Sequence, residues 1–236
     1  MSIPNGGYGE LFILSPPHAG TTAMAKLLLS SPRVWSRIGN AEGQKLPESE
    51  PFLGKKLWSP KHVADWNGLK SVWEEGRPEG AILLEKSPPI MAHVEALLQT
   101  WPCAYFVISM RHPLALVASY LARRGASEHQ LREAVTRWIH RSKLQRRNVR
   151  RLEGRALVTS YESFAAAPAA FVAALEQVFG PLQVDVARPL EVKRYAPAPI
   201  SDHNARQIAT LSPEHLAQAR QLLQIDGARD LSFWGY

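Results

Sequence analysis

The chain has 236 residues, a formal net charge of +7, and 45% hydrophobic and 21% charged residues. This composition is typical of a globular protein and excludes a disordered, collagen-like or coiled-coil chain. A single cysteine, Cys103, excludes an intrachain disulfide and a cysteine-rich metal site, and no apolar run is long enough to predict a membrane-spanning helix.

The N-terminal part predicts one strand and one helix, followed by an irregular stretch. Leu11–Ser15 is a short apolar run, which is typical of a buried strand. The segment Pro16–Gly20 breaks this strand, and apolar residues at helical spacing predict a helix over Thr21–Ser31, which Pro32 ends. Residues 33–80 are rich in proline and glycine, so we interpret them either as a long lid-like insertion or as a set of short helices.

The rest of the chain alternates strands with helices. Apolar runs predict three more strands, at Ala81–Glu85, Ala104–Met110 and Ala156–Ser160. Apolar periodicity and capping residues predict helices from Ser87 to Trp101, over Leu114–Arg124, from Ser127 to about Leu152, over Phe171–Phe179, and from Ser212 onward. This alternation indicates an α/β fold in which helices cover both faces of a parallel sheet. The sequence shows no domain boundary, so we expect residues 1–236 to form a single domain.

The positive charge is concentrated in one segment. Between Arg123 and Arg155 the sequence has eleven Arg or Lys residues against three Glu residues, which is a net charge of +8. Such a stripe attracts anionic partners, but it is equally typical of a solvated helix face, and both interpretations stay open. Nucleic-acid binding is not expected, because such a surface interleaves aromatic rings with its cations and here only Trp138 does so.

Polar residues follow each predicted strand. In open parallel sheets, ligands bind beyond the carboxyl ends of the strands. The first strand is followed by a loop that contains His18, the second by Lys86, the third by Arg111 and the fourth by Tyr161. Since these strand ends share one edge of the sheet, we expect two cations, a histidine and a ring to converge there. Such a set suits an anionic nucleotide.

The loop after the first predicted strand is the strongest candidate for an anion-binding site. Gly20 precedes Thr21 and Thr22 at the start of a helix, where exposed N–H groups and the helix dipole attract an anion. In the triphosphate-binding loop G-x-x-x-x-G-K-[ST] a lysine reaches the phosphates, but Thr21 stands at that position here. No Asp follows any of the four strands to hold Mg²⁺. Both absences count against a P-loop kinase or other phosphotransferase, which we keep as an alternative.

Four short motifs occur in order between Leu11 and Gly180. They are Pro17-His18-Ala19-Gly20-Thr21-Thr22, then Glu85-Lys86-Ser87-Pro88, then Arg111 and Pro113 with Ser119, and finally Tyr161-Glu162-Ser163-Phe164. In this order they resemble the sulfotransferases that use 3′-phosphoadenosine 5′-phosphosulfate (PAPS), whose motifs read roughly P-[RK]-[SA]-G-[TS]-T, [KE]-K-[ST]-P, R-x-P-x5-S and Y-E-x-[LF].

The resemblance implies a P-loop-like sulfotransferase fold and a role for individual residues. Its donor-binding residues would be Pro17, His18, Ala19, Gly20, Thr21 and Thr22 at the phosphosulfate, Arg111 and Ser119 at the 3′-phosphate, and Tyr161 at the adenine. Its catalytic residues would be His18 and Lys86 at the leaving phosphate and Glu42 as the general base, with Glu48 and Glu50 as weaker candidates for the base.

One position departs from the family pattern. His18 stands where the family has Arg or Lys, and a histidine stabilises a leaving phosphate only when it is protonated. Two functions therefore stay open. The chain transfers a sulfuryl group from PAPS to an acceptor hydroxyl or amine, or it is a degenerate, non-catalytic relative that binds the nucleotide.

The resemblance also leads us to expect certain partners. PAPS would be the donor, no metal would be needed, and the acceptor would be a small molecule with a hydroxyl group. The irregular segments 33–80 and 188–210 would form the acceptor site. The lack of a leader, an anchor and disulfides leads us to expect a cytoplasmic protein with no membrane partner.

Overall fold

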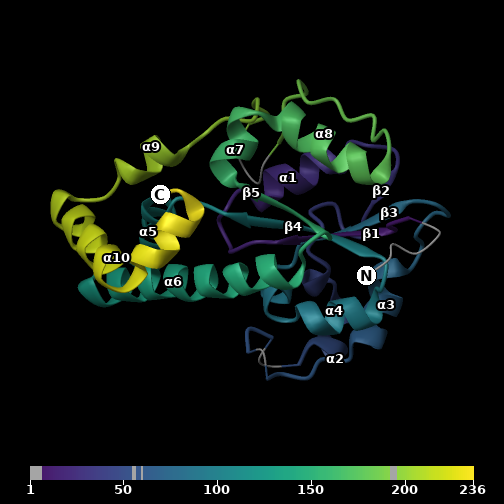
Figure 1. Cartoon of the computed structure of the whole chain (residues 1–236), viewed down its shortest axis with the longest axis horizontal. Coiled ribbons are helices and arrows are strands. Elements are labelled where there is room, and N and C mark those ends of the chain that lie inside the picture. The colour runs from purple at the N-terminus through teal and green to yellow at the C-terminus, as the bar shows by residue number, and fades with distance from the viewer. Residues whose placement is uncertain (1–6, 55–56, 60, 192–195) are drawn as a thin grey trace.

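The computed structural model describes residues 7–54, 57–59, 61–191 and 196–236. Within these residues, the centre is a sheet of five parallel strands: β1 (Glu10–Leu14), β2 (Val34–Trp35), β3 (Ile82–Glu85), β4 (Ala104–Met110) and β5 (Ala156–Ser160). The strands lie in the order β2-β3-β1-β4-β5, so the first strand is central (Figure 1). The α/β fold expected from the alternating pattern is confirmed.

The four predicted strands are all present, and β4 and β5 have the predicted bounds. Strands such as β1 and β4 are nearly continuous apolar runs because helices cover both of their faces. The strand that the sequence does not predict is β2, in which Val34 pairs with Ile82 and Trp35 with Leu83. A strand of two residues has no periodicity that a sequence pattern could reveal.

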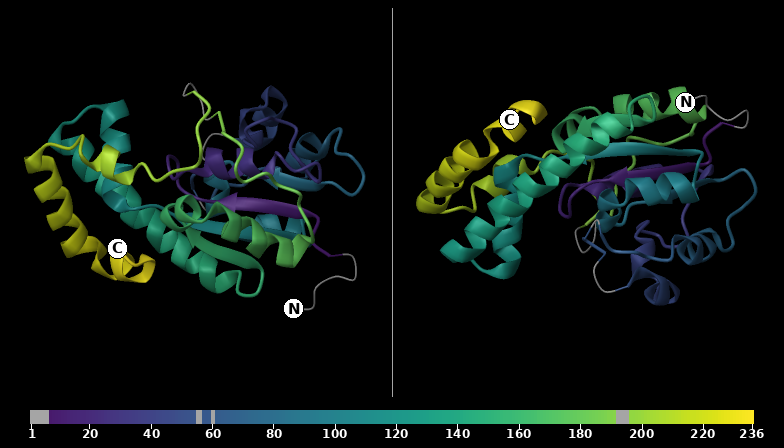
Figure 2. Two further views of the ribbon diagram at one scale, coloured as in Figure 1. Left: turned by 90° about the horizontal axis from the view of Figure 1, so that it is seen from above. Right: turned by 60° about the horizontal axis from the view of Figure 1, so that its bottom comes forward.

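Helices cover both faces of the sheet (Figures 1 and 2). On one face lie α1 (Thr21–Leu28), α7 (Tyr161–Ala166) and α8 (Pro168–Phe179), where Leu11 and Ile13 share a core with Phe171. On the other face lie α3 (Trp66–Glu74), α4 (Val94–Thr100) and α6 (Glu128–Arg151), where Phe12 shares a core with Trp101. The alternate residues of β1 therefore point into two separate cores, as the pleat of a strand requires.

Residues 33–80 are a set of short helices, which decides between the two interpretations of that segment. Among the described residues they form the 3₁₀ turns η1 (Gly43–Lys45) and η2 (Pro47–Ser49), then α2 (Glu50–Leu53) and α3. The carboxylate of Asp65 caps α3 by accepting a hydrogen bond of 2.9 Å from the backbone N–H of Gly68. The buried Trp73 of α3 stacks on Trp101 with 5.7 Å between the ring centroids, which fastens the segment to the sheet.

Two predicted helices differ from the structure in detail. The helix expected over Thr21–Ser31 ends earlier, because α1 stops at Leu28. The helix expected from Ser87 to Trp101 is divided at His93 into a 3₁₀ turn, η3 (Pro88–Ala92), and α4.

Three helices pack together at one end of the molecule: α5 (Pro113–Arg124), α6 and α10 (Pro213–Trp234), with the short α9 (Asn204–Ile208) beside α5. Ser127 caps α6 and Ser212 caps α10, as predicted. The buried Gln145 of α6 donates hydrogen bonds to the carbonyl oxygens of Leu14 at 2.6 Å and Ser109 at 3.3 Å. This contact fixes α6 against the carboxyl ends of β1 and β4. In the described part of the chain, no helix has the length and apolar character needed to cross a membrane.

Candidate functional site

The loop between β1 and α1 meets the end of β5. His18 and Gly20 both have left-handed backbone conformations, with φ of 69° and 80°. A Cβ on Gly20 would lie 2.2 Å from Cδ2 of Tyr161, so only glycine allows the tyrosine ring to pack this closely on the loop. The structure therefore places His18, Gly20 and Tyr161 side by side, as the strand-end argument predicts.

Arg111, which follows β4, holds these two segments together. Its side chain is buried, with 4% of the residue exposed, and its Nη1 donates to the backbone carbonyl of His18 at 2.9 Å. Its Nε donates to Oδ1 of Asn204 at 2.7 Å, and its guanidinium lies over the ring of Tyr161, 4.0 Å from the centroid. Its Nη2 is buried and has no hydrogen-bond partner among the described residues. A buried guanidinium with one unused nitrogen is a strong candidate for anion binding.

A carboxylate orders the groups behind Arg111. Glu162 accepts hydrogen bonds from the backbone N–H of His112 at 2.9 Å, from the amide of Asn204 and from the hydroxyl of Tyr236 at 2.8 Å. Burial opposes its ionisation, but these donors outweigh burial and lower the pKa of Glu162. Glu162 therefore stays ionised and fixes Asn204, which in turn orients Arg111. The sequence does not predict the role of Asn204, because its neighbours carry no motif and its partner lies 93 residues away.

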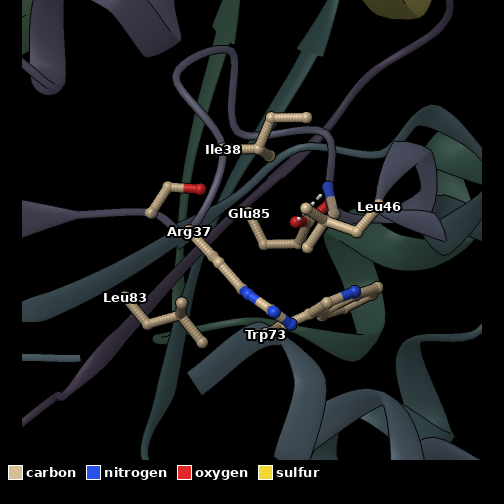
Figure 3. Close-up of a pocket in the computed structure, with 8 residues that line it drawn as sticks. Arg37, Ile38, Leu46, Trp73, Leu83 and Glu85 are labelled. Carbon is tan, nitrogen blue, oxygen red and sulfur yellow. Dashed lines mark hydrogen bonds between the residues drawn. The ribbon is translucent and has the colours of Figure 1, made fainter. Parts of the chain in front are cut away.

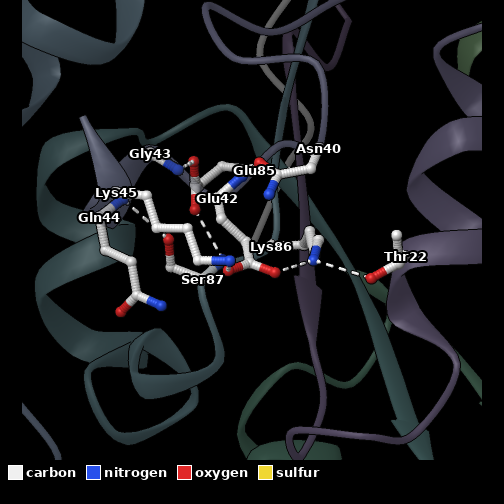
Figure 4. Close-up of polar contacts among 9 residues, drawn as sticks. All are labelled: Thr22, Asn40, Glu42, Gly43, Gln44, Lys45, Glu85, Lys86 and Ser87. Carbon is white, nitrogen blue, oxygen red and sulfur yellow. Dashed lines mark hydrogen bonds and ion pairs between the residues drawn. The ribbon is translucent and has the colours of Figure 1, made fainter. Parts of the chain in front are cut away.

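A second cationic centre lies on the other side of β1, after β3. Lys86 is 1% exposed, and its Nζ forms an ion pair with Glu42 and lies 3.4 Å from Oγ1 of Thr22 at the start of α1 (Figure 4). Glu42 also pairs with Lys45. The structure thus brings together three residues predicted for the site: Thr22, Glu42 and Lys86.

The charges of this second centre perturb one another. Burial lowers the pKa of Lys86, and the contact with Glu42 opposes that effect. Burial would raise the pKa of Glu42, but its hydrogen bonds to Lys45 and Lys86 outweigh burial and lower it. The contact between the two side chains thus favours the charged form of each. The pair is stabilised as an ion pair in a site that is largely closed to water.

Glu85 is a buried carboxylate that holds two segments of this second centre together. Its carboxylate is 1% exposed and accepts hydrogen bonds from the backbone N–H groups of Gly43 at 2.8 Å and Ser87 at 2.6 Å. It lines a narrow pocket together with Arg37 and Trp73 (Figure 3). Burial raises the pKa of Glu85 to about 7. This carboxylate connects the turn that carries Glu42 to the strand end that carries Lys86.

The other predicted site residues lie around these two centres or apart from them. Ala19 and Thr21 are buried in the loop and in the first turn of α1, whereas Pro17 is partly exposed. Ser119 lies partly exposed on α5, and no contact of the described residues joins it to Arg111. Glu48 is exposed and pairs with Arg37 at 3.0 Å, away from Lys86.

The geometry defines what this edge of the sheet can bind. One buried cation with an unused nitrogen lies on the β4 side of the loop, and one buried lysine lies on the β3 side. The backbone N–H groups that open α1 lie between them. A ligand with two separated anionic groups and a flat ring fits this arrangement. Among the described residues, no group of three His, Cys, Asp or Glu side chains is placed to hold a metal ion.

Comparison with protein families gives a match over most of the chain. The model described as "Sulfotransferase family" matches residues 10–182, which include both cationic centres and the loop between them. No curated protein sequence matches the chain.

Solved structures share the fold at low sequence identity. A sulfotransferase domain from the curacin biosynthetic pathway has a TM-score of 0.61 and 18% identity, covering 97% of this chain and 98% of that one. A sulfotransferase domain from the olefin synthase of Synechococcus PCC 7002 has a TM-score of 0.58 and 17% identity, covering 100% and 98%. A sulfotransferase from Alicyclobacillus acidocaldarius has a TM-score of 0.57 and 16% identity, covering 95% of each chain.

Proposed function

The chain belongs to the sulfotransferase family, and from this premise we propose that it transfers a sulfuryl group from PAPS to a hydroxyl group of a small molecule. The observation that carries the proposal is Arg111. Its buried Nη2 has no partner among the described residues, and its guanidinium lies against the ring of Tyr161. PAPS presents a 3′-phosphate close to an adenine ring, which is the pair of groups that this geometry complements.

The remaining residues of the site also suit this donor. The backbone N–H groups at Thr21 and Thr22 open α1, where the helix dipole stabilises the 5′-phosphate. From the end of the neighbouring strand β3, the side chain of Lys86 approaches Thr22 in the first turn of α1. Ser119 on α5 would add a hydroxyl to the 3′-phosphate site, and His18 would lie beside the leaving phosphate.

The proposed reaction is a single in-line displacement. The acceptor oxygen forms a bond to sulfur while the bond between sulfur and the 5′-phosphate oxygen breaks, and its electron pair leaves with adenosine 3′,5′-bisphosphate. Glu42 takes the proton of the acceptor hydroxyl. Lys86, His18 and the loop N–H groups stabilise the negative charge that develops on the leaving phosphate. Atoms and charge balance without a further reactant.

The contact between Lys86 and Glu42 has a consequence for this mechanism. As long as Glu42 pairs with two lysines, its lowered pKa makes it a weak base. A donor phosphate beside Thr22 would draw Lys86 away from Glu42, because it offers a stronger concentration of negative charge. Loss of that partner would raise the pKa of Glu42. Donor binding would thus activate the base only when the leaving group is already in place.

Nucleotide binding gives the first test. We expect adenosine 3′,5′-bisphosphate at about 100 times its dissociation constant to stabilise the fold by roughly 2.7 kcal/mol, with a clear rise in Tm. AMP and Mg-ATP at the same concentration should give little or no rise. Arg111→Gln should abolish the rise, whereas Arg124→Gln, which changes an exposed arginine of α5, should keep it.

Release of sulfate from PAPS, with water as the acceptor, tests transfer itself without knowledge of the acceptor. We expect slow release by the wild-type protein and at least a tenfold slower release by Lys86→Met. Binding of the bisphosphate without any release would identify a degenerate binding protein. A rise in Tm with Mg-ATP alone would favour the kinase alternative and contradict the proposal.

A further inference from the structure

A small cavity lies beside the loop between β1 and α1, on the side of α5 and α6. Its volume is about 20 Å³, which is enough for one water-sized group. Its lining includes Pro17 and His18 of the loop, Tyr120 of α5, and Arg137, Trp138 and Arg141 of α6. Neither Lys86 nor Arg111 lines this cavity.

Arg141 is the cation of this cavity that lacks a counter-ion. Arg137 is paired with Glu133 through two hydrogen bonds of 2.8 and 2.5 Å, and Tyr120 donates to the same carboxylate at 2.6 Å. For Arg141, the described residues provide no carboxylate within ion-pair distance, and the undescribed positions contain no Asp or Glu. Its partner among the described residues is a ring: the guanidinium lies 4.9 Å from the centroid of Trp58.

Burial and the neighbouring charge of Arg137 lower the pKa of Arg141 to about 10. The side chain remains charged at neutral pH, so the fold keeps a partly desolvated positive charge without neutralising it. Such a charge is unfavourable in the ligand-free protein. An oxyanion in the cavity would restore the missing partner and would be held by a planar guanidinium suited to two hydrogen bonds.

We propose that Arg141 forms a subsite for an oxyanionic group of the acceptor, such as a carboxylate or a phosphate. The proposal rests on the proposed function. Two features place the acceptor there rather than the donor. The donor has a cation for each of its anionic ends, Arg111 and Lys86. Trp58, whose ring lies beside Arg141, belongs to the segment 33–80, in which we expect part of the acceptor site.

The dimensions of the subsite restrict the acceptor further. The cavity admits one oxygen of an anionic group but no ring. The rest of the acceptor must therefore lie outside it, where the ring of Trp58 is 45% exposed. The expected acceptor therefore has an oxyanion that binds Arg141, an apolar or aromatic part that packs on the ring of Trp58, and a hydroxyl group directed towards Glu42.

Sodium sulfate is a suitable probe, at an ionic strength held constant with sodium chloride and with the donor site saturated by adenosine 3′,5′-bisphosphate. We expect saturable sulfate binding, measured by calorimetry, that Arg141→Gln weakens at least tenfold. Arg147→Gln, an exposed arginine of the same helix, should leave it unchanged. Lys86→Met should also leave it unchanged, which separates this subsite from the position of the transferred sulfuryl group.

Several outcomes would overturn the subsite. They are the absence of saturable sulfate binding, equal sulfate affinity of Arg141→Gln and the wild-type protein, a loss of sulfate binding in Lys86→Met, or competition between sulfate and the bisphosphate.

Arg141→Gln removes no ion pair, so its Tm should equal or exceed that of the wild-type protein. Arg141→Lys should retain part of the sulfate affinity. If the bisphosphate does not bind at all, the proposed function fails, and the same titration on Arg111→Gln without nucleotide still tests the anion site.

Discussion

Glu85 is a carboxylate that the fold withdraws from water and surrounds with backbone donors. It accepts hydrogen bonds from Gly43 and Ser87, yet burial dominates and raises its pKa to about 7. In the unfolded chain the same group has an ordinary pKa near 4.5. The folded state therefore binds this proton more tightly than the unfolded state does, and folding is favoured where the group is protonated.

This difference predicts how stability depends on pH. The contribution of Glu85 is fully present below pH 4.5 and is lost as the pH rises to about 7, at a cost of roughly 3 kcal/mol. Glu85→Gln should remove this loss, because glutamine resembles the protonated acid. Urea unfolding of both proteins at pH 5 and pH 7.5 measures the effect. Equal changes in the free energy of unfolding would contradict the assignment.

At the scale of elements, the loop between β1 and α1 depends on one glycine. Gly20 has φ of 80°, and the ring of Tyr161 occupies the space that its Cβ would need. Gly20→Ala should therefore lower the free energy of unfolding by about 2 kcal/mol or more, through backbone strain and the clash together. It should also displace the ring and weaken binding of adenosine 3′,5′-bisphosphate.

A second glycine separates these two causes. Gly80 has φ of 72°, but a Cβ there would meet nothing within 4 Å. Gly80→Ala should lower the free energy of unfolding by only about 1 kcal/mol, the cost of the backbone conformation alone, and should leave nucleotide binding intact. Chemical denaturation and a nucleotide titration on both variants check this. Equal effects would show that packing of Tyr161 on the loop is unimportant.

The elements that carry most of the site could be predicted because each has a strong local signal. Strands β1, β3, β4 and β5 consist mostly of apolar residues, and parallel pairing then places Lys86, Arg111 and Tyr161 at one edge. Residues that act through distant partners have no such signal. Asn204 and Arg141 are examples, because neither spacing nor composition encodes which side chain faces them. Family resemblance implies separate catalytic roles for Glu42 and Lys86, but nothing in the sequence predicts that they form an ion pair.

At the scale of the whole molecule, α10 closes the end of the fold that carries Arg111. Asp230 is 1% exposed and accepts hydrogen bonds from Ser142 and from Arg146, each at 2.9 Å. Trp234 donates to the same Ser142 at 2.9 Å, and Tyr236 reaches Glu162. The packing of α10 on α6 is therefore coupled to the carboxylate that orders Asn204.

Asp230→Ala should lower the free energy of unfolding by about 3 to 5 kcal/mol, because it leaves the charge of Arg146 buried and unpaired. The loss should also weaken nucleotide binding, through Tyr236 and Glu162. Asp226→Ala, an exposed position on α10, is the matched control and should change neither property. Denaturation curves and a bisphosphate titration give both values. A stable Asp230→Ala protein would mean that α10 is not tied to the core through this carboxylate.

The large separation of Arg111 and Asn204 along the sequence has a consequence for folding during translation. The two residues are 93 positions apart, so at ordinary ribosomal speeds the arginine emerges roughly 5 to 20 seconds before its partner. During that interval the central strands can form, but the Nε of the guanidinium still lacks its partner Asn204. A nascent chain would therefore acquire its full affinity for the nucleotide only after Asn204 has emerged. Binding of the nucleotide would then selectively protect from proteolysis those molecules in which the contact between Arg111 and Asn204 has formed.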